Sequence, residues 1–224
     1  MYHLDDIPFN SSSMLDMYTQ FHKASFNSMV TNSVLTNTYD YELPYVFDIL
    51  VHKGMKFMGG ESAAVGRVFE YFWKKDLVKV YKETRNGKLG PDYSMKFSPW
   101  LVSRSLSPCY IYEEVKRYER ERQANDSIYG VLFELIWRDY FRFISLKYGN
   151  ALLHLGGPRK VEHKWIQDQK LFESWRDGYT WYPLIHANIK ELTTGYMSNR
   201  GQQIICSFLV RDMGILTILR EQLF

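Results

Sequence analysis

The sequence has few cysteines and no long apolar run. Its two cysteines, Cys109 and Cys206, lie far apart and follow no metal-ligand spacing, and we interpret them as reduced thiols of an intracellular protein. The six histidines are scattered without an HExxH or a paired Cys/His pattern, so no metal site is expected. No apolar run approaches the roughly 18 to 20 residues that span a membrane, so no membrane contact is expected.

A strong charge excess and targeting features are also missing. The 28 basic and 25 acidic residues give a formal net charge of +3, which permits nucleic-acid contact without arguing for it. The N-terminal stretch MYHLDDIPFN holds acidic residues and no apolar run. It therefore predicts neither a signal peptide nor a transit peptide.

Aromatic residues, by contrast, make up 17% of the chain, and hydrophobic residues make up 46%. They suffice for a sizeable core and also allow stacking surfaces for flat ligands. No convincing set of alternating strands occurs, so the sequence predicts an all-α fold from about residue 60 onward. Residues 1–59, rich in Asn, Ser and Thr, predict a mostly irregular linker, in which short helices fit around Met14 to Lys23 and Tyr45 to His52.

Several segments after residue 60 carry helix signals. A Ser-Pro start at Ser107 opens a helix whose alternating charges predict a solvated face. WIQDQKLFESWRDG predicts an amphipathic helix that ends at Gly178, and PLIHANIKELTTG predicts another. Ser198 fits the N-cap of the last helix and Gly214 fits its stop. The first segment follows two glycines and repeats apolar residues near helical spacing, namely Ala64, Val68, Phe69, Phe72 and Leu77.

The segment SIYGVLFELIWRDYFRFISLKYGN places a charged and aromatic stripe on one helix. Glu134, Trp137 and Arg138 share a face because residues three and four apart are neighbours, and Phe141 extends it. A second face is apolar and is interrupted by Asp139. Such a helix is expected to be buried, so its charged groups need partners, either other side chains or a ligand. The apolar face comprises Ile128, Val131, Leu132 and Leu135.

The segment SMKFSPWL combines hydroxyl groups with a helix start. Ser94 and Ser98 bracket residues that lead into a helix at Pro99, where hydroxyls and backbone N–H groups can hold phosphate. The alternative is an ordinary capped helix start. The stretch GGESAAVGR lacks the G-x4-G-K-[ST] spacing of a phosphate loop, so no nucleotide motif is assigned there.

The last predicted helix carries a second polar stripe. Asn199, Gln202, Gln203 and Cys206 follow helical spacing, and the stripe either faces a ligand or belongs to a satisfied core network. Gly201 costs about 1 kcal/mol relative to Ala within a helix. It therefore indicates a close approach by a ligand or by another backbone segment.

These motifs together resemble a known family. ELIWRDYFRF, WIQDQKLFESWRDG, MSNRGQQIICSFLVRDMG and the run from GGESAAVGR to KFSPWL closely resemble the flavin-binding helical domain of the photolyase/cryptochrome family, best in its plant-like DASH class. YHLDDIPF and YTQFHKA resemble the segment that joins the family's two domains. The resemblance covers most of residues 56–215, and the ordered set of motifs is highly specific although no single motif is.

The resemblance implies a cofactor and a site. In the family, a U-shaped FAD lies in a bowl of helices, and a flipped pyrimidine dimer enters above it. The match implies that Arg138 lines the flavin site with Tyr81 near the pyrophosphate, and that Asn199 lies beside both flavin and lesion. The implied pyrophosphate-binding residues are Ser94, Met95, Lys96, Phe97 and Ser98. The implied catalytic residues are Glu134, Trp137 and Asn199, and the implied DNA-binding residues are Glu134, Trp137, Arg200 and Gln203.

The resemblance also implies an activity. In the family, light-driven electron transfer from reduced FAD splits the cyclobutane ring of a pyrimidine dimer, and DASH members favour single-stranded DNA. The residue types suit this task, because a carboxyl group can bond a base edge, an indole can stack and arginine suits phosphate. The class suggests a chloroplast or mitochondrial location and a role in photoreception.

The chain departs from the family at both ends. We expect the chain to lack the family's N-terminal α/β antenna domain and therefore to bind no antenna pigment. We expect a FAD-binding domain over residues 60–215 that is incomplete at its C-terminus, followed by a divergent tail at 216–224. Of the electron-transfer tryptophans only Trp165 resembles a retained member, while Trp175 is expected in the core.

Single positions depart as well. Trp181 stands where the family usually has Gly, and we expect it to strain a turn that needs positive φ. His186 replaces a usual Asp, and Gln202 replaces an Arg whose acidic partner is also lost. The turn in WLVSRSLSP lacks the glycine that the family pattern places there.

Two functional hypotheses follow. The first is a FAD-dependent DASH cryptochrome or photolyase acting on DNA. The alternative is a non-catalytic helical module that binds nucleic acid or a partner protein through remaining cations such as Arg200 and Lys96. A chain without independent function is the third reading. Co-purifying flavin favours the first, and salt-dependent binding of single-stranded DNA without flavin favours the second.

Overall fold

The computed structural model describes residues 11–26, 57–88, 90–162 and 164–215. Every regular element among these residues is a helix and none is a strand, which confirms the predicted all-α class. The described residues form two compact units, each with its own core. The first unit contains residues 11–26, 57–87 and 91–149, and the second contains residues 88, 90, 150–162 and 164–215.

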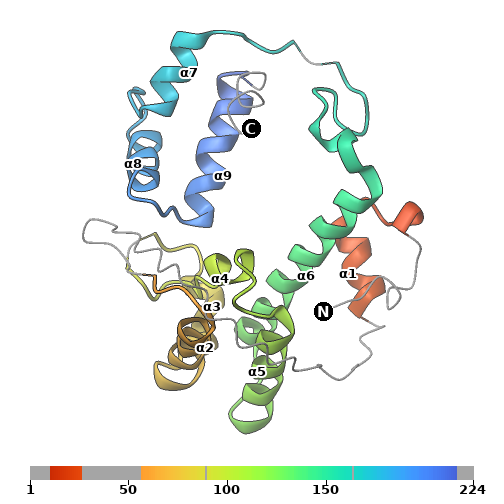
Figure 1. Ribbon diagram of the computed structural model, residues 1–224, viewed down its shortest axis with the longest axis vertical. Coiled ribbons are helices and arrows are strands. Elements are labelled where there is room, and N and C mark those ends of the chain that lie inside the picture. The colour runs from red at the N-terminus through yellow and green to blue at the C-terminus, as the bar shows by residue number, and fades with distance from the viewer. Residues whose placement is uncertain (1–10, 27–56, 89, 163, 216–224) are drawn as a thin grey trace. The chain divides into compact units, whose positions relative to one another are not determined.

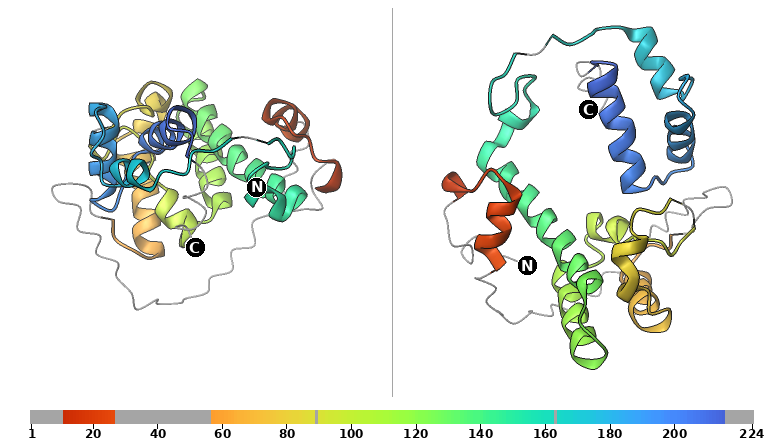
Figure 2. Two further views of the ribbon diagram at one scale, coloured as in Figure 1. Left: turned by 90° about the horizontal axis from the view of Figure 1, so that it is seen from above. Right: turned by 180° about the vertical axis from the view of Figure 1, so that it is seen from behind.

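The long helix α6 (Asp126–Tyr148) organises the first unit. Its N-cap is Asn125, whose side chain accepts a hydrogen bond from the N–H of Ile128 at 3.0 Å. Figures 1 and 2 show α1 (Tyr18–Phe26) along the C-terminal half of α6 and α5 (Pro108–Glu121) along its beginning. The short helix α3 (Tyr81–Thr84) also packs against α6.

Helix α1 confirms the short helix expected around Met14 to Lys23, with bounds shifted toward the C-terminus. Tyr18 and Phe21 are buried against α6 in a cluster that also includes Met14. The helix expected around Tyr45 to His52 lies outside the described residues. The α6 residues of this cluster are Ile136, Tyr140 and Phe143.

Helix α2 (Glu61–Phe69) begins after Gly60 and continues into one turn of π-helix (Glu70–Lys74), in which the N–H of Lys75 donates to the carbonyl of Glu70 at 2.8 Å. Asp76, with a φ of 56°, separates this turn from a 3-10 turn (Leu77–Val80) that leads into α3. The predicted apolar face is correct for Ala64, Val68 and Phe72, which are buried. It is wrong for Phe69, whose side chain is 58% exposed.

Helix α4 (Ser98–Val102) and helix α5 are joined by a tight turn. Ser107 caps α5 as predicted, since its side chain accepts from the N–H of Cys109 at 3.2 Å. Ile111, Val115 and Tyr118 form the buried face of α5, and its charged face is solvated as expected. Arg104 in the turn has a φ of 62°, which explains why the family pattern places glycine in this segment.

Replacing Arg104 by glycine is expected to stabilise the first unit by about 0.5–1 kcal/mol, because glycine adopts positive φ without the steric cost that a side chain brings. Arg104 is exposed, so the substitution removes little packing. Urea denaturation followed by circular dichroism measures the change. Arg104→Ala keeps the Cβ atom and should give no gain. An equal gain in both variants would contradict the explanation through backbone strain.

The second unit contains three described α-helices, of which the first two follow one another along the side of the third (Figure 1). They are α7 (Gln169–Arg176), α8 (Pro183–Leu192) and α9 (Asn199–Ser207), which continues into a π-helical turn (Phe208–Asp212). Asp168 caps α7, so this helix starts later than the predicted Trp165. Gly178 and Gly214 have φ values of 75° and 65° and follow the ends of their helices as predicted. The core comprises Phe172, Trp175, Ile185, Ile189, Met197, Ile205, Leu209, Met213 and Ile215.

Of the two predictions about tryptophans in this unit, the one for Trp175 is confirmed and the one for Trp181 is wrong. Trp175 is buried in this core, and its indole N–H donates to the carbonyl of Ile205 at 3.2 Å, which confirms the structural role. The expected strain at Trp181 is wrong. Its φ is not positive, and its side chain is 99% exposed, so the indole meets no steric obstacle within the described residues. His186, the other substituted position nearby, contacts the carbonyl of Gly178 through its ring Nδ1.

Candidate functional site

The stripe on α6 is half-exposed rather than buried. The opposite face, with Ile128, Val131, Leu132 and Leu135, is buried as predicted, and Asp139 is fully buried beside it. Phe141, however, is 58% exposed, and Arg138 is also exposed. The expectation of a fully buried helix is therefore wrong, because the described neighbours of α6 cover its apolar face and leave much of the stripe accessible.

Glu134 has a side chain as its partner. Its carboxylate pairs with the guanidinium of Arg85 at 2.6 Å, and both groups are about one-third exposed. Arg138 lies farther from a carboxylate, with 3.8 Å between its Nη1 and the Oδ1 of Asp139. Tyr81 is buried next to this pair, and burial, followed by the negative charge of Glu134, raises the pKa of its hydroxyl. A carboxyl group paired with an arginine thus lies on the accessible side of α6.

Trp137 belongs to an aromatic stack that the sequence did not predict. The ring of Tyr18 from α1 lies 3.5 Å from the indole, with an angle of 6° between the planes. Phe141 is stacked at 5.4 Å and 23°, and Phe133 and Tyr140 meet the indole edge-on. Tyr18 therefore fixes the orientation of the indole, and one ring face is already in contact with another aromatic ring.

The segment before α4 is organised by Arg67, a residue that the sequence reading missed. Arg67 lies on the buried face of α2 and is only 7% exposed. Its guanidinium donates to the carbonyls of Pro91 at 2.9 Å, Ser94 at 3.3 Å and Met95 at 3.2 Å. The signal that could have found it is a charged residue at i+3 within an apolar helical stripe, after Ala64.

Two carboxylates balance the charge of Arg67. Its Nη1 lies 3.0 Å from Glu70 and 3.3 Å from Asp92, and Lys75 bridges the same two carboxylates at 2.8 and 2.9 Å. Hydrogen bonds from Lys75 and then Arg67 lower the pKa of Glu70. Burial acts to raise the pKa of Asp92, but hydrogen bonds from Lys75 and Arg67 outweigh it and lower that pKa.

The backbone from Ser94 to Ser98 leaves donors available. Among the described residues, none accepts a hydrogen bond from the N–H groups of Ser94, Met95, Phe97 or Ser98. Lys96 has a φ of 57° and the following Phe97 is right-handed, with φ −79° and ψ −11°. Alternation of left- and right-handed residues makes neighbouring N–H groups converge into an anion-binding concavity.

Two details of this segment correct the sequence reading. Helix α4 starts at Ser98, one residue before the predicted Pro99, and the alternative of a capped start is wrong, because Phe97 is the N-cap residue and no side chain caps the helix. Lys96 is 5% exposed, and its Nζ lies 3.8 Å from the centre of the Tyr93 ring, so it cannot belong to an exposed nucleic-acid-binding face. The buried cation instead packs on the Tyr93 ring and belongs to the same segment as the available N–H groups.

In the second unit, the structure brings Asn199, Arg200 and Gln203 together on the exposed side of α9. The Nη1 of Arg200 donates to the Oε1 of Gln203 at 2.8 Å. Gln202 and Cys206 are exposed as well, so the alternative of a satisfied core network is wrong for this stripe.

Gly201 makes room for side chains of its own unit. A Cβ atom at this position would lie 2.6 Å from the Oδ1 of Asn188 and 2.9 Å from the Cγ of Met197. The close approach predicted at Gly201 is therefore real, but its cause is the packing of buried side chains against the start of α9. The expected ligand or second backbone is not the neighbour.

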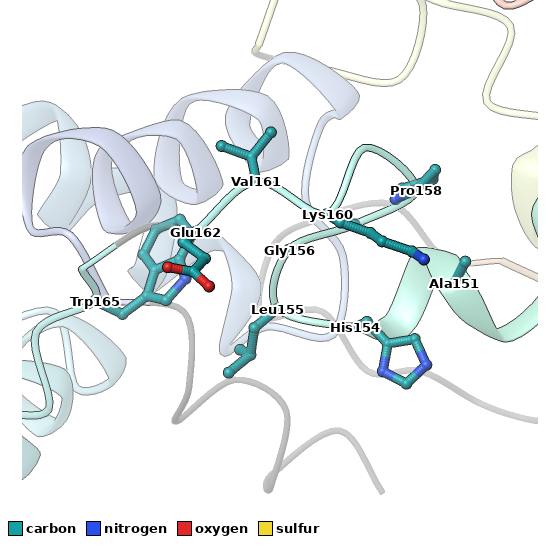
Figure 3. A pocket seen from close by; sticks show the side chains of 10 residues that line it. Ala151, His154, Leu155, Gly156, Pro158, Lys160, Val161, Glu162 and Trp165 are labelled. Atoms are coloured by element: carbon teal, nitrogen blue, oxygen red, sulfur yellow. The ribbon is translucent and has the colours of Figure 1, made fainter.

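Trp165 lies in the segment between α6 and α7, next to Ile166, whose N–H donates to the carbonyl of Gly214 at 2.8 Å. It is half-buried and lines an open cavity of about 570 Å³ together with His154, Lys160 and Glu162. Figure 3 shows Trp165 and Glu162 on one side of this cavity and His154 and Lys160 on the other. Its predicted part in electron transfer stays a prediction.

In residues 11–26, 57–88, 90–162 and 164–215, no three His, Cys, Asp or Glu side chains are grouped so that they could hold a metal ion. None of the helices in these ranges has the length and hydropathy of a membrane span. Cys109 and Cys206 form no disulfide.

Comparison with known proteins gives consistent matches. Residues 131–224 match the family described as the FAD-binding domain of DNA photolyase. The chain is 63% identical to "Cryptochrome DASH, chloroplastic/mitochondrial" from rice (Oryza sativa subsp. japonica) and 62% identical to the protein of that name from Arabidopsis thaliana. These matches cover 96% of this chain and 40% and 41% of the relatives. The chain thus spans about two-fifths of the length of these relatives.

A solved structure agrees with these relatives. The cryptochrome of Synechocystis sp. PCC6803 superposes with a TM-score of 0.83 at 44% identity, over 95% of this chain and 48% of that one. The helical architecture, the ordered motifs and these matches lead to one conclusion. The chain belongs to the photolyase/cryptochrome family, within its DASH cryptochromes.

Proposed function

We propose that this chain binds FAD and that the segment from Ser94 to Ser98 holds the pyrophosphate. The supporting observation is the loop itself, whose carbonyls are engaged by Arg67 while four N–H groups have no acceptor among the described residues. Lys96, which is buried in the same segment, contributes a positive charge. Converging donors next to a helix start suit a phosphate group, so these residues fit this part of the cofactor.

Other residues are proposed for the flavin site through the family match. Tyr81 would pack near the pyrophosphate, and the exposed guanidinium of Arg138 would line the flavin site. Asn199 would offer its side-chain amide beside flavin and lesion. When bound in reduced form and illuminated, FAD supplies an electron.

The proposed substrate is a cyclobutane pyrimidine dimer, mainly in single-stranded DNA, and the proposed overall activity is blue-light-driven repair and light sensing. Glu134 would accept a hydrogen bond from a base edge, because Arg85 supports its carboxylate charge. Trp137 would stack on the lesion from an orientation fixed by Tyr18.

On α9, Arg200 would contact the DNA backbone, since its guanidinium is exposed and held by Gln203. Gln203 would lie beside it on the DNA side of the site. We also propose a chloroplast or mitochondrial location, because the rice and Arabidopsis relatives carry these compartments in their names.

Flavin binding by the purified chain tests this proposal. We expect FAD to bind and its flavin fluorescence to be quenched. Riboflavin lacks the pyrophosphate and therefore loses charge-assisted hydrogen bonds, so we expect it to bind at least about tenfold more weakly. Lys96→Met should weaken FAD binding and leave riboflavin binding unchanged. Lys82→Met, which removes an exposed lysine of the same unit, is the matched control. A folded chain that binds no FAD would contradict the proposal.

The non-catalytic alternative rests on the exposed Arg200. A folded, flavin-free chain whose affinity for single-stranded DNA falls with salt would favour it. Arg200→Gln should then reduce the slope of log affinity against log salt by about 1. Blue-light repair of dimer-containing oligonucleotides by the flavin-loaded chain would decide for the first function.

A further inference from the structure

Arg67 makes an unusual set of contacts for a helical arginine. All three guanidinium nitrogens are in use, and three of the acceptors are carbonyls of Pro91, Ser94 and Met95, within five consecutive residues. The remaining acceptors are the carboxylates of Glu70 and Asp92. A planar guanidinium holds its donors in a fixed fork, so it can set the direction of several carbonyls at once.

The direction of these carbonyls determines where the neighbouring N–H groups point. In a trans peptide group the C=O of one residue and the N–H of the next point in opposite directions. The described residues contain no cis peptide bond. By turning the carbonyls of Ser94 and Met95 toward itself, Arg67 directs the N–H groups of Met95 and Lys96 away from its guanidinium.

The charge of Arg67 is itself not directed at a ligand. Two cations, Arg67 and Lys75, face two carboxylates, Glu70 and Asp92, within 3.3 Å. A guanidinium balanced in this way acts through the loop that it holds. Its effect on a bound anion is therefore indirect.

We propose that Arg67 is a positioning residue that fixes the anion-binding conformation of residues 94–98 before any ligand arrives. The expected effect of Arg67 on cofactor affinity rests on the proposed FAD binding. The expected ordering of the ligand-free loop by Arg67 does not depend on that proposal. Lysine cannot replace arginine here, because one ammonium group cannot bond three carbonyls in the geometry of the fork.

Trypsin cleavage at the Lys96–Phe97 bond tests the proposal in the ligand-free chain. The Lys96 side chain is buried, so cleavage requires local opening of the loop, and its rate reports the open population. Arg67→Lys and Arg67→Gln should raise this rate at least about tenfold, as expected when one or more net hydrogen bonds are lost. Cleavage at the exposed Arg117 should stay unchanged and report an intact fold. Arg104→Gln, an exposed arginine of the same unit, is the matched control.

Ligand binding separates positioning from general stability. The Arg67 variants should bind FAD at least about tenfold more weakly, comparable to one lost hydrogen bond, and bind riboflavin unchanged. Equal losses for both ligands would overturn the positioning role. A faster loop cleavage together with a wild-type chain that binds no FAD would support the ordering of the loop and refute the flavin proposal.

A second variant keeps the test decisive if both Arg67 variants unfold. Glu70→Gln combined with Asp92→Asn neutralises two carboxylates that are about one-third exposed and changes neither Arg67 nor its carbonyl acceptors. Cleavage at Lys96 should then rise about threefold, the loss expected for partly exposed ion pairs. An unchanged rate in this variant, or in folded Arg67 variants, overturns the proposal.

Discussion

Replacing Trp175 by alanine is expected to destabilise the second unit by about 3–5 kcal/mol. Trp175 is buried in the core of this unit, where its ring packs 5.7 Å from that of Phe172. Its indole N–H donates to the carbonyl of Ile205, so the substitution leaves a cavity and removes one of the hydrogen bonds that this carbonyl accepts. Urea denaturation monitored by circular dichroism measures the loss.

Trp181→Ala is the matched control, because it removes the same side chain from the same unit at a fully exposed position. We expect it to change the free energy of unfolding by less than about 0.5 kcal/mol. Similar losses in the two variants would show that the core assignment of Trp175 is wrong.

Replacing Phe72 by alanine is expected to cost the first unit about 3–5 kcal/mol. Phe72 is fully buried, and its ring packs against Phe97 at 6.3 Å and against Tyr118 at 6.2 Å. Phe97 is part of the proposed anion-binding segment, so the substitution should also weaken FAD binding. Thermal and urea denaturation measure the first effect, and flavin titration measures the second.

Phe69→Ala tests the same change three residues earlier. Its side chain is largely exposed, so the expected loss is below about 0.5 kcal/mol and flavin binding should not change. The sequence alone treats Phe69 and Phe72 as one apolar stripe. A large loss of unfolding free energy in Phe69→Ala and none in Phe72→Ala would contradict the burial that the structure assigns to these two residues.

Helix boundaries and caps were largely predictable from local sequence. Ser107 and Ser198 accept the hydrogen bonds expected of N-caps, and Gly178 and Gly214 have the positive φ values expected after helix ends. These features depend on residues within one helical turn, so the local pattern contains the necessary information. The start of α4 is the exception, because its N-cap is Phe97 and no side chain caps it.

The partners of the candidate site could not be predicted in the same way. The carbonyls held by Arg67 lie 24 to 28 residues away, and the Arg85–Glu134 pair spans 49 residues. Tyr18 and Trp137, which stack at 3.5 Å, come from opposite ends of the first unit's sequence. A single sequence contains no record of which long-range pairs meet.

By itself the sequence determined the helical class, the helix caps, the apolar face of α6 and, through its ordered motifs, the family. Periodicity is sufficient for these features because it reports which side of a helix avoids water. The burial of Lys96, the hydrogen bonds from Arg67 to the loop before α4 and the close contact between Gly201 and Asn188 follow only from the folded chain. Each of these depends on which surface covers a residue, and that is fixed by packing between segments distant in the chain.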